Sequence, residues 1–218
     1  MFQSALSLCL LTQIGDQPLD TYLNFLKKAI DGGVTSVQFR DKTSKTEVIR
    51  DRAFALKAFL TPLNIPLIIN DDVLLAKEVQ AEGVHLGQRD TSPQISRQLL
   101  GPGKIIGLSI ETQDELKRAD QLSCIDYIGL SAVFPSQSKN NCTTIWGLDG
   151  LKMAAQQSKH PIIAIGGINL SNIRKVIAHG ASGVALIQAI HEQPEMAEEI
   201  TAQLIQAMNE GQIHAKSH

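Results

Sequence analysis

Polar residues at the ends of two apolar segments could together bind a divalent cation. Asn70 and Asp71 follow an apolar run that begins at Pro66, and Asp90 follows a second run at residues 83–87. A helix-like segment separates the runs, and in a parallel strand–helix–strand unit both strands end on the same side of the sheet. We therefore expect Asp71 and Asp90 to meet in space. Two carboxylates beside an amide oxygen suit Mg2+, which keeps coordination positions for water and for phosphate oxygens of a substrate.

The same Asn-Asp-Asp sequence is also typical of a helix N-terminus. Asn70 or Asp71 could cap the following helix, and Asp72 would then complement the helix dipole. Taken alone, capping is the commoner role for such residues. The second acidic strand end, at Asp90, is the observation that favours the cation site.

Hydrogen-bond donors follow an earlier apolar run. Residues 38–42 read Gln-Phe-Arg-Asp-Lys, and the alternation of a strand places Gln38, Arg40 and Lys42 on one side. A guanidinium and an ammonium group beside an amide suit the oxygens of a diphosphate. A solvated charged turn is the alternative interpretation, and for Arg40 alone the two carry equal weight.

Later segments offer glycines and hydroxyl groups. A Gly-Gly pair at 166–167 follows another apolar run, where backbone N–H groups can approach a phosphate, and the backbone at Ile187 and Gln188 could complete that site. Ser109 ends a further run. The loop at 134–139, Phe-Pro-Ser-Gln-Ser-Lys, is rich in hydroxyls, although such a loop is more often only a solvated connection.

The elements that must position these residues alternate regularly along the chain. Apolar segments separated by amphipathic ones recur eight times and predict strands at Leu6–Thr12, Thr35–Arg40, Pro66–Asn70, Gly83–Gly87, Lys104–Ile110, Tyr127–Val133, Pro161–Gly166 and Gly183–Ile190. This alternation predicts the α/β class and a single (β/α)8 TIM barrel, with an open doubly wound sheet as the alternative. We expect one barrel domain at residues 1–210 and a frayed polar tail at 211–218.

Composition excludes several classes of partner. The chain has 218 residues and a net charge of −2, with 43% hydrophobic and 19% charged residues. No basic field favours nucleic acid or an anionic membrane, and no run approaches the roughly 18 apolar residues that span a bilayer. The three cysteines, an odd number without metal-type spacing, suit a reduced cytosol, so we expect a cytoplasmic protein. This composition is compatible with a monomer and with a homo-oligomer.

A series of motifs then runs in order along most of the chain: Gln-Phe-Arg-Asp-Lys at 38–42, Ile-Asn-Asp-Asp at 69–72, Gly-Val-His-Leu-Gly-Gln-Arg-Asp at 83–90, Gly-Leu-Ser at 107–109, Val-Phe-Pro-Ser-Gln-Ser-Lys at 133–139, Ile-Gly-Gly-Ile at 165–168 and Gly-Val-Ala-Leu-Ile at 183–187. In combination they resemble the thiamine phosphate synthase family. The resemblance implies a Mg2+-dependent transferase of thiamine biosynthesis. Such an enzyme couples 4-amino-2-methyl-5-(hydroxymethyl)pyrimidine diphosphate to 4-methyl-5-(2-phosphoethyl)thiazole, and diphosphate is released through a transition state resembling a pyrimidine cation.

The resemblance also implies a role for each matching residue. Asp71 and Asp90 would hold Mg2+, the diphosphate would contact Arg40, Lys42, Asn70 and Lys139, and the pyrimidine would face Gln38 and Ser109. The thiazole phosphate would be received by Ser136 and Ser138 and by the backbone of Gly167, Ile187 and Gln188. Within this set the catalytic residues would be Arg40, Lys42, Ser109 and Lys139.

The sequence departs from the family pattern at several positions. Gln188 stands where the family usually has a serine, Ser131-Ala132 where it usually has Gly-Pro, and Ser136 and Ser138 where it usually has threonines. Two other functions are therefore weighed. One is the related thiazole tautomerase, which typically has a histidine where this chain has Glu111 and tends to lack the paired aspartates. The other is a non-catalytic barrel that binds phosphate ligands.

Overall fold

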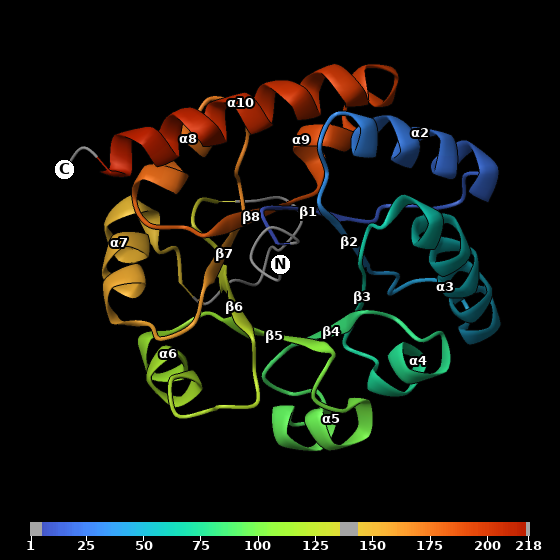
Figure 1. The fold of residues 1–218 in the computed structure, drawn as a ribbon, viewed down its shortest axis with the longest axis horizontal. Coiled ribbons are helices and arrows are strands. Elements are labelled where there is room, and N and C mark those ends of the chain that lie inside the picture. Colours follow the sequence, from blue (N-terminus) through green and yellow to red (C-terminus); the bar gives the residue numbers. More distant parts are fainter. Residues whose placement is uncertain (1–5, 136–143, 217–218) are drawn as a thin grey trace.

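The computed structural model describes residues 6–135 and 144–216. Eight parallel strands close into a barrel in chain order: each pairs with the strands next to it in the sequence, and β8 pairs with β1 to close the barrel (Figure 1). The strands are β1 (Leu8–Leu11), β2 (Ser36–Phe39), β3 (Leu67–Asn70), β4 (Gly83–Leu86), β5 (Ile105–Ile110), β6 (Tyr127–Ser131), β7 (Ile162–Ile165) and β8 (Gly183–Leu186). The predicted (β/α)8 barrel is confirmed, and the open sheet is excluded.

Helices surround the barrel as an outer layer (Figure 1). They are α2 (Leu19–Asp31), α3 (Thr46–Leu60), α4 (Val73–Glu78), α5 (Pro93–Leu100), α6 (Gln113–Ala119), α7 (Gly147–Gln157), α8 (Ile173–Ala178), α9 (Gln188–His191) and α10 (Ala197–Lys216), with 3-10 turns η1 (Thr61–Leu63) and η2 (Pro194–Met196). No helix in the described part of the chain has an apolar stretch long enough to cross a membrane.

The buried side chains form two clusters because alternate residues of each strand face opposite sides of the sheet. The larger cluster joins the outer face of the strands to the helices. The smaller one fills the barrel interior and includes Cys9, Ile68, Ile105, Tyr127 and Ile163. This inner cluster forms an apolar floor beneath the C-terminal ends of the strands.

Strand β8 and the C-terminal helix end several residues away from the positions that the sequence predicts. Strand β8 ends at Leu186 instead of reaching Ile190, because the backbone amides of Ile190 and His191 both bond to the Ile187 carbonyl, at 3.3 and 3.2 Å, and begin α9. Helix α10 continues to Lys216, through most of the segment expected to be a frayed tail. Gly211 is buried there, and a Cβ on it would lie 2.6 Å from the Arg174 carbonyl oxygen of α8, so close helix packing explains the extension.

Candidate active site

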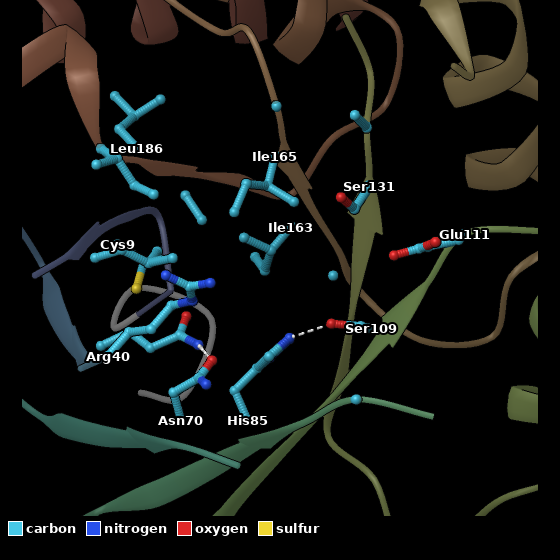
Figure 2. A pocket seen from close by; sticks show the side chains of 18 of the residues that line it. Cys9, Arg40, Asn70, His85, Ser109, Glu111, Ser131, Ile163, Ile165 and Leu186 are labelled. Carbon is cyan, nitrogen blue, oxygen red and sulfur yellow. Dashed lines mark hydrogen bonds between the residues drawn. The ribbon is translucent and has the colours of Figure 1, made fainter. Parts of the chain in front are cut away.

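A cavity of about 660 Å³ opens at the C-terminal ends of the strands. Its lining brings together every predicted site residue that lies in the described part of the chain: Gln38, Arg40, Lys42, Asn70, Asp71, Asp90, Ser109, Gly167, Ile187 and Gln188. Ser136, Ser138 and Lys139 lie outside the described residues. Figure 2 shows Cys9, Arg40 and Asn70 on one side of the cavity and Ser109, Glu111 and Ser131 on the opposite side, with Ile163 and Ile165 between them. The cavity therefore combines charged and polar walls with an apolar interior.

The two aspartates do meet. Partial burial raises the pKa of Asp90, and the adjacent Asp71 carboxylate raises it further, although the Gly87 amide donates a 2.6 Å hydrogen bond to Asp90 Oδ2 and opposes the shift. Lys42 Nζ lies 3.0 Å from Asp71 Oδ2. One ammonium thus faces two neighbouring carboxylates, and the pair carries excess negative charge at neutral pH.

Neither Asn70 nor Asp71 caps the helix after β3. The cap of α4 is Asp72, whose carboxylate accepts a 2.9 Å hydrogen bond from the Leu75 amide. Asp71 has a left-handed backbone with φ of 67°, and its amide donates to the His85 carbonyl at 2.8 Å. Aspartate tolerates this conformation better than most residues. The Asn70 and Asp71 side chains are therefore not used in helix capping, and both residues line the cavity.

Backbone and side-chain hydrogen bonds hold the donor residues of the second strand end. Gln38 Nε2 donates to Asn70 Oδ1 at 2.9 Å, which fixes both amides across neighbouring strands. The Arg40 amide donates to the Thr12 hydroxyl at 2.9 Å, and the guanidinium points into the cavity (Figure 2). Arg40 and Lys42 therefore lie on the same wall as the carboxylate pair.

An ion pair pins the loop that carries these two cations. Arg52 of α3 contacts Asp41 at 2.7 Å, and only 14% and 7% of the two side chains is exposed. The same guanidinium donates to the Gly15 carbonyl at 2.8 Å and to the Ser44 hydroxyl at 3.0 Å. Burial alone would raise the pKa of Asp41, but hydrogen bonds from Ser44, Thr43 and Arg52 lower it to about 2.

A hydrogen-bonded histidine on the cavity wall was not among the predicted site residues. His85 of β4 lines the cavity and bonds Tyr127 through Nδ1 at 2.9 Å. Its Nε2 bonds Ser109 at 2.8 Å (Figure 2). Glycines provide the space for these rings. A Cβ on Gly129 would lie 2.8 Å from His85 Cε1, and one on Gly107 would lie 2.1 Å from the Tyr127 ring. Two glycines at inward positions of adjacent strands were the available signal.

The turns after β7 and β8 border the far side of the cavity. Gly166 and Gly167 have φ values of 100° and 63°, and a Cβ on Gly167 would lie 2.5 Å from the Pro135 carbonyl oxygen, so this turn requires glycine. Asn172 Nδ2 donates to the Gly167 carbonyl at 2.9 Å and fixes the turn. Ile187 and Gln188 line the cavity directly after β8. The glycine turn and the β8–α9 turn are thus neighbours at the place expected for a phosphate group.

The carboxylate pair suits a Mg2+ ion that keeps part of its water better than it suits a metal ion enclosed entirely by protein ligands. The described residues contain no group of three or more His, Cys, Asp and Glu side chains arranged to hold an ion. Two adjacent carboxylates next to the Asn70 amide nevertheless match the partial ligand set that Mg2+ takes when phosphate oxygens supply the rest. Partial burial and the neighbouring Asp71 both raise the pKa of Asp90, and a divalent cation between the two carboxylates would offset the repulsive part.

Comparison with known proteins agrees with this arrangement. The family model described as thiamine monophosphate synthase matches residues 8–190. The thiamine-phosphate synthase of Vibrio campbellii is 50% identical over 84% of this chain and 90% of its own length, and that of Chlamydia caviae is 42% identical over 88% and 90%.

A solved structure supports the same assignment. The thiamine phosphate pyrophosphorylase of Pyrococcus furiosus superimposes with a TM-score of 0.84 at 28% identity, covering 97% of this chain and all of its own. A family match over most of the barrel, together with relatives above 40% identity across nearly their full length, places this chain in the thiamine monophosphate synthase family.

Proposed function

We propose that this protein is a Mg2+-dependent thiamine phosphate synthase that works through the residues brought together in its cavity. The substrates are the pyrimidine diphosphate and the thiazole phosphate, and the products are thiamine phosphate and diphosphate. The observation that carries the proposal is the position of the Asp71–Asp90 pair on the same wall as Arg40 and Lys42. A carboxylate pair beside two cations suits a metal-bound diphosphate more than it suits a neutral ligand.

In the proposed reaction, the thiazole nitrogen forms a C–N bond to the methylene carbon of the pyrimidine. The C–O bond to the diphosphate breaks, and its electron pair leaves with the diphosphate oxygen. The aminopyrimidine ring carries positive charge in the transition state. Because the thiazole nitrogen attacks with its own lone pair, no strong base is needed. Arg40 and Lys42 stabilise the departing negative charge. The barrel walls hold the two rings near each other.

Asp71 and Asp90 would hold Mg2+, with Asn70 beside them. When bound, the ion would neutralise charge that develops on the diphosphate as it leaves. Gln38 and Ser109 would orient the pyrimidine, because the Gln38 amide is fixed by Asn70 and the Ser109 hydroxyl by His85. Lys139, Ser136 and Ser138 keep the roles that the family resemblance assigns to them.

A coupling assay tests the proposal. Purified protein is mixed with both substrates and Mg2+, and thiamine phosphate is measured by mass spectrometry and fluorescence after oxidation. The expected result is catalytic product formation. A protein that binds both substrates without turnover would instead be a phosphate-binding barrel. Isomerisation of a thiazole tautomer without coupling would identify a tautomerase.

A further inference from the structure

A half-buried histidine on the short helix after β8 belongs to a hydrogen-bond chain outside the catalytic wall. His191 Nδ1 lies 2.8 Å from the Ile187 carbonyl, and Nε2 lies 3.1 Å from the Tyr22 hydroxyl of α2. The Tyr22 oxygen also accepts a hydrogen bond from the Gln13 amide at 3.3 Å. Figure 1 shows α9 between the end of β8 and the start of α2. The chain thus joins the β8–α9 turn to the loop after β1.

Each hydrogen in this chain has a defined place. A carbonyl can only accept, so His191 Nδ1 carries a proton and donates it to Ile187. Burial lowers the pKa of His191, against the opposing effect of the Ile187 carbonyl, so the ring is neutral and Nε2 accepts from the Tyr22 hydroxyl. The Tyr22 oxygen then accepts from Gln13. A single tautomer satisfies all three contacts.

Aromatic packing keeps the ring in this orientation. The His191 ring stacks on Tyr22 with centroids 5.9 Å apart and an interplanar angle of 19°, and it lies 4.7 Å from the Phe25 ring. Tyr22 is fully buried and Phe25 nearly so. The hydrogen bond to Ile187 therefore comes from a side chain that is itself held on two sides, and the histidine cannot easily turn away.

We infer that His191, held by Tyr22, is a positioning residue that fixes the β8–α9 turn for the thiazole phosphate. His191 does not line the cavity itself, but its Nδ1 bonds the carbonyl of Ile187, and Ile187 and Gln188 border the cavity. This inference rests on the proposed function, because the phosphate at this turn belongs to that proposal. The carboxylate pair follows β3 and β4, across the barrel from β8, so we expect the larger effect on the thiazole phosphate.

Tyr22→Phe tests the inference with the ring packing kept. Loss of the hydroxyl leaves His191 Nε2 and the Gln13 amide without this partner. We expect the KM for thiazole phosphate to rise roughly three- to tenfold, with kcat and the KM for pyrimidine diphosphate within about twofold of the parent. His191→Phe keeps an aromatic ring against Tyr22 and Phe25 but removes both hydrogen bonds of the imidazole. It should show the same pattern as Tyr22→Phe, and it replaces that variant as the test if Tyr22→Phe folds poorly.

The only other tyrosine of the chain supplies a matched control. Tyr127→Phe removes an equivalent hydroxyl from the His85 side of the cavity, where the pyrimidine is expected. Tyr127→Phe should change the KM for pyrimidine diphosphate more than it changes the KM for thiazole phosphate.

The possible outcomes are distinct. The inference is overturned if Tyr22→Phe and His191→Phe leave the thiazole phosphate KM unchanged in an active enzyme, or if Tyr22→Phe and Tyr127→Phe raise it equally. A parent protein that makes no thiamine phosphate would instead overturn the proposed function.

Discussion

At the scale of single residues, the carboxylate pair dominates the electrostatics of the cavity. Asp90 has a raised pKa, first because its carboxylate is partly removed from water and then because Asp71 lies beside it. A folded-state pKa above the unfolded value means that the contribution of this group to stability is fully present below the unfolded pKa. That contribution is lost as the pH rises through the folded pKa. Without metal, the ionised pair therefore opposes folding at neutral pH.

Asp90→Asn should remove this repulsion while keeping an oxygen that accepts from the Gly87 amide. Relative to the parent, the metal-free variant should gain stability as the pH rises from about 4 to 7. Denaturant unfolding at the two pH values measures the difference. The variant should also lose most of the thermal shift that Mg2+ gives the parent. An unchanged Mg2+ shift in Asp90→Asn would remove this residue from the metal site.

Gln188 is a position in the expected phosphate site where a hydroxyl side chain of the family pattern is replaced by an amide. A serine hydroxyl there would add a hydrogen bond to a charged oxygen, worth about 1.5–3 kcal/mol at most, whereas ordering the longer glutamine loses side-chain entropy. We expect Gln188→Ser to leave kcat nearly unchanged and to lower the thiazole phosphate KM modestly. If titration shows that Gln188→Ser binds thiazole phosphate more weakly than the parent, the glutamine amide makes a specific contact.

At the scale of elements, the loop after β2 depends on the Asp41–Arg52 ion pair. Arg52→Ala would leave a mostly buried carboxylate without its partner, a change that typically destabilises by about 3–5 kcal/mol for fully buried pairs and by less at a loop edge. Because the loop carries Arg40 and Lys42, the KM for pyrimidine diphosphate should rise several-fold. Steady-state kinetics with each substrate varied in turn would check this. Equal changes in both KM values would indicate a general loss of structure.

The pH dependence of this ion pair has the opposite sign to that of Asp90. The folded pKa of Asp41 is about 2, below its ordinary value of 3.8, so its stabilisation is present above pH 4 and is lost as the pH falls toward 2. The parent should therefore be more stable than Asp41→Asn at pH 6, and the difference should shrink on acidification. A difference that stayed constant from pH 6 to pH 2.5 would contradict this.

Element positions could largely be read from the sequence, because the alternation of apolar and amphipathic segments records which faces are buried. The exceptions have local causes. The end of β8 was missed because Ile187-Gln188-Ala189-Ile190 has the apolar content of a strand, and only the hydrogen bonds to the Ile187 carbonyl reveal a helix. The extension of α10 depends on packing against α8, a contact between elements that periodicity does not record.

At the scale of the whole molecule, barrel closure is what assembles the site. Strand ends that are far apart in sequence converge because all eight strands are parallel and ordered, so residues after the second, third and fourth strands could be grouped in advance. The links between strands could not. The bonds from His85 to Tyr127 and to Ser109 depend on the registers of β4, β5 and β6 and on the space left by Gly107 and Gly129.

In the proposed mechanism, the Asp71–Asp90 pair assists departure of the diphosphate through Mg2+. The most direct measurement is the rate of thiamine phosphate formation from both substrates as Mg2+ is titrated, in the parent and in a matched Asp71→Asn/Asp90→Asn variant. The activity of the parent should saturate with Mg2+ and should be lost in a chelator. The rate of the variant should be lower than that of the parent by well over tenfold at saturating substrates, as expected when stabilisation of a leaving group is lost. Full activity of the parent in the chelator, or a variant as fast as the parent, would contradict it.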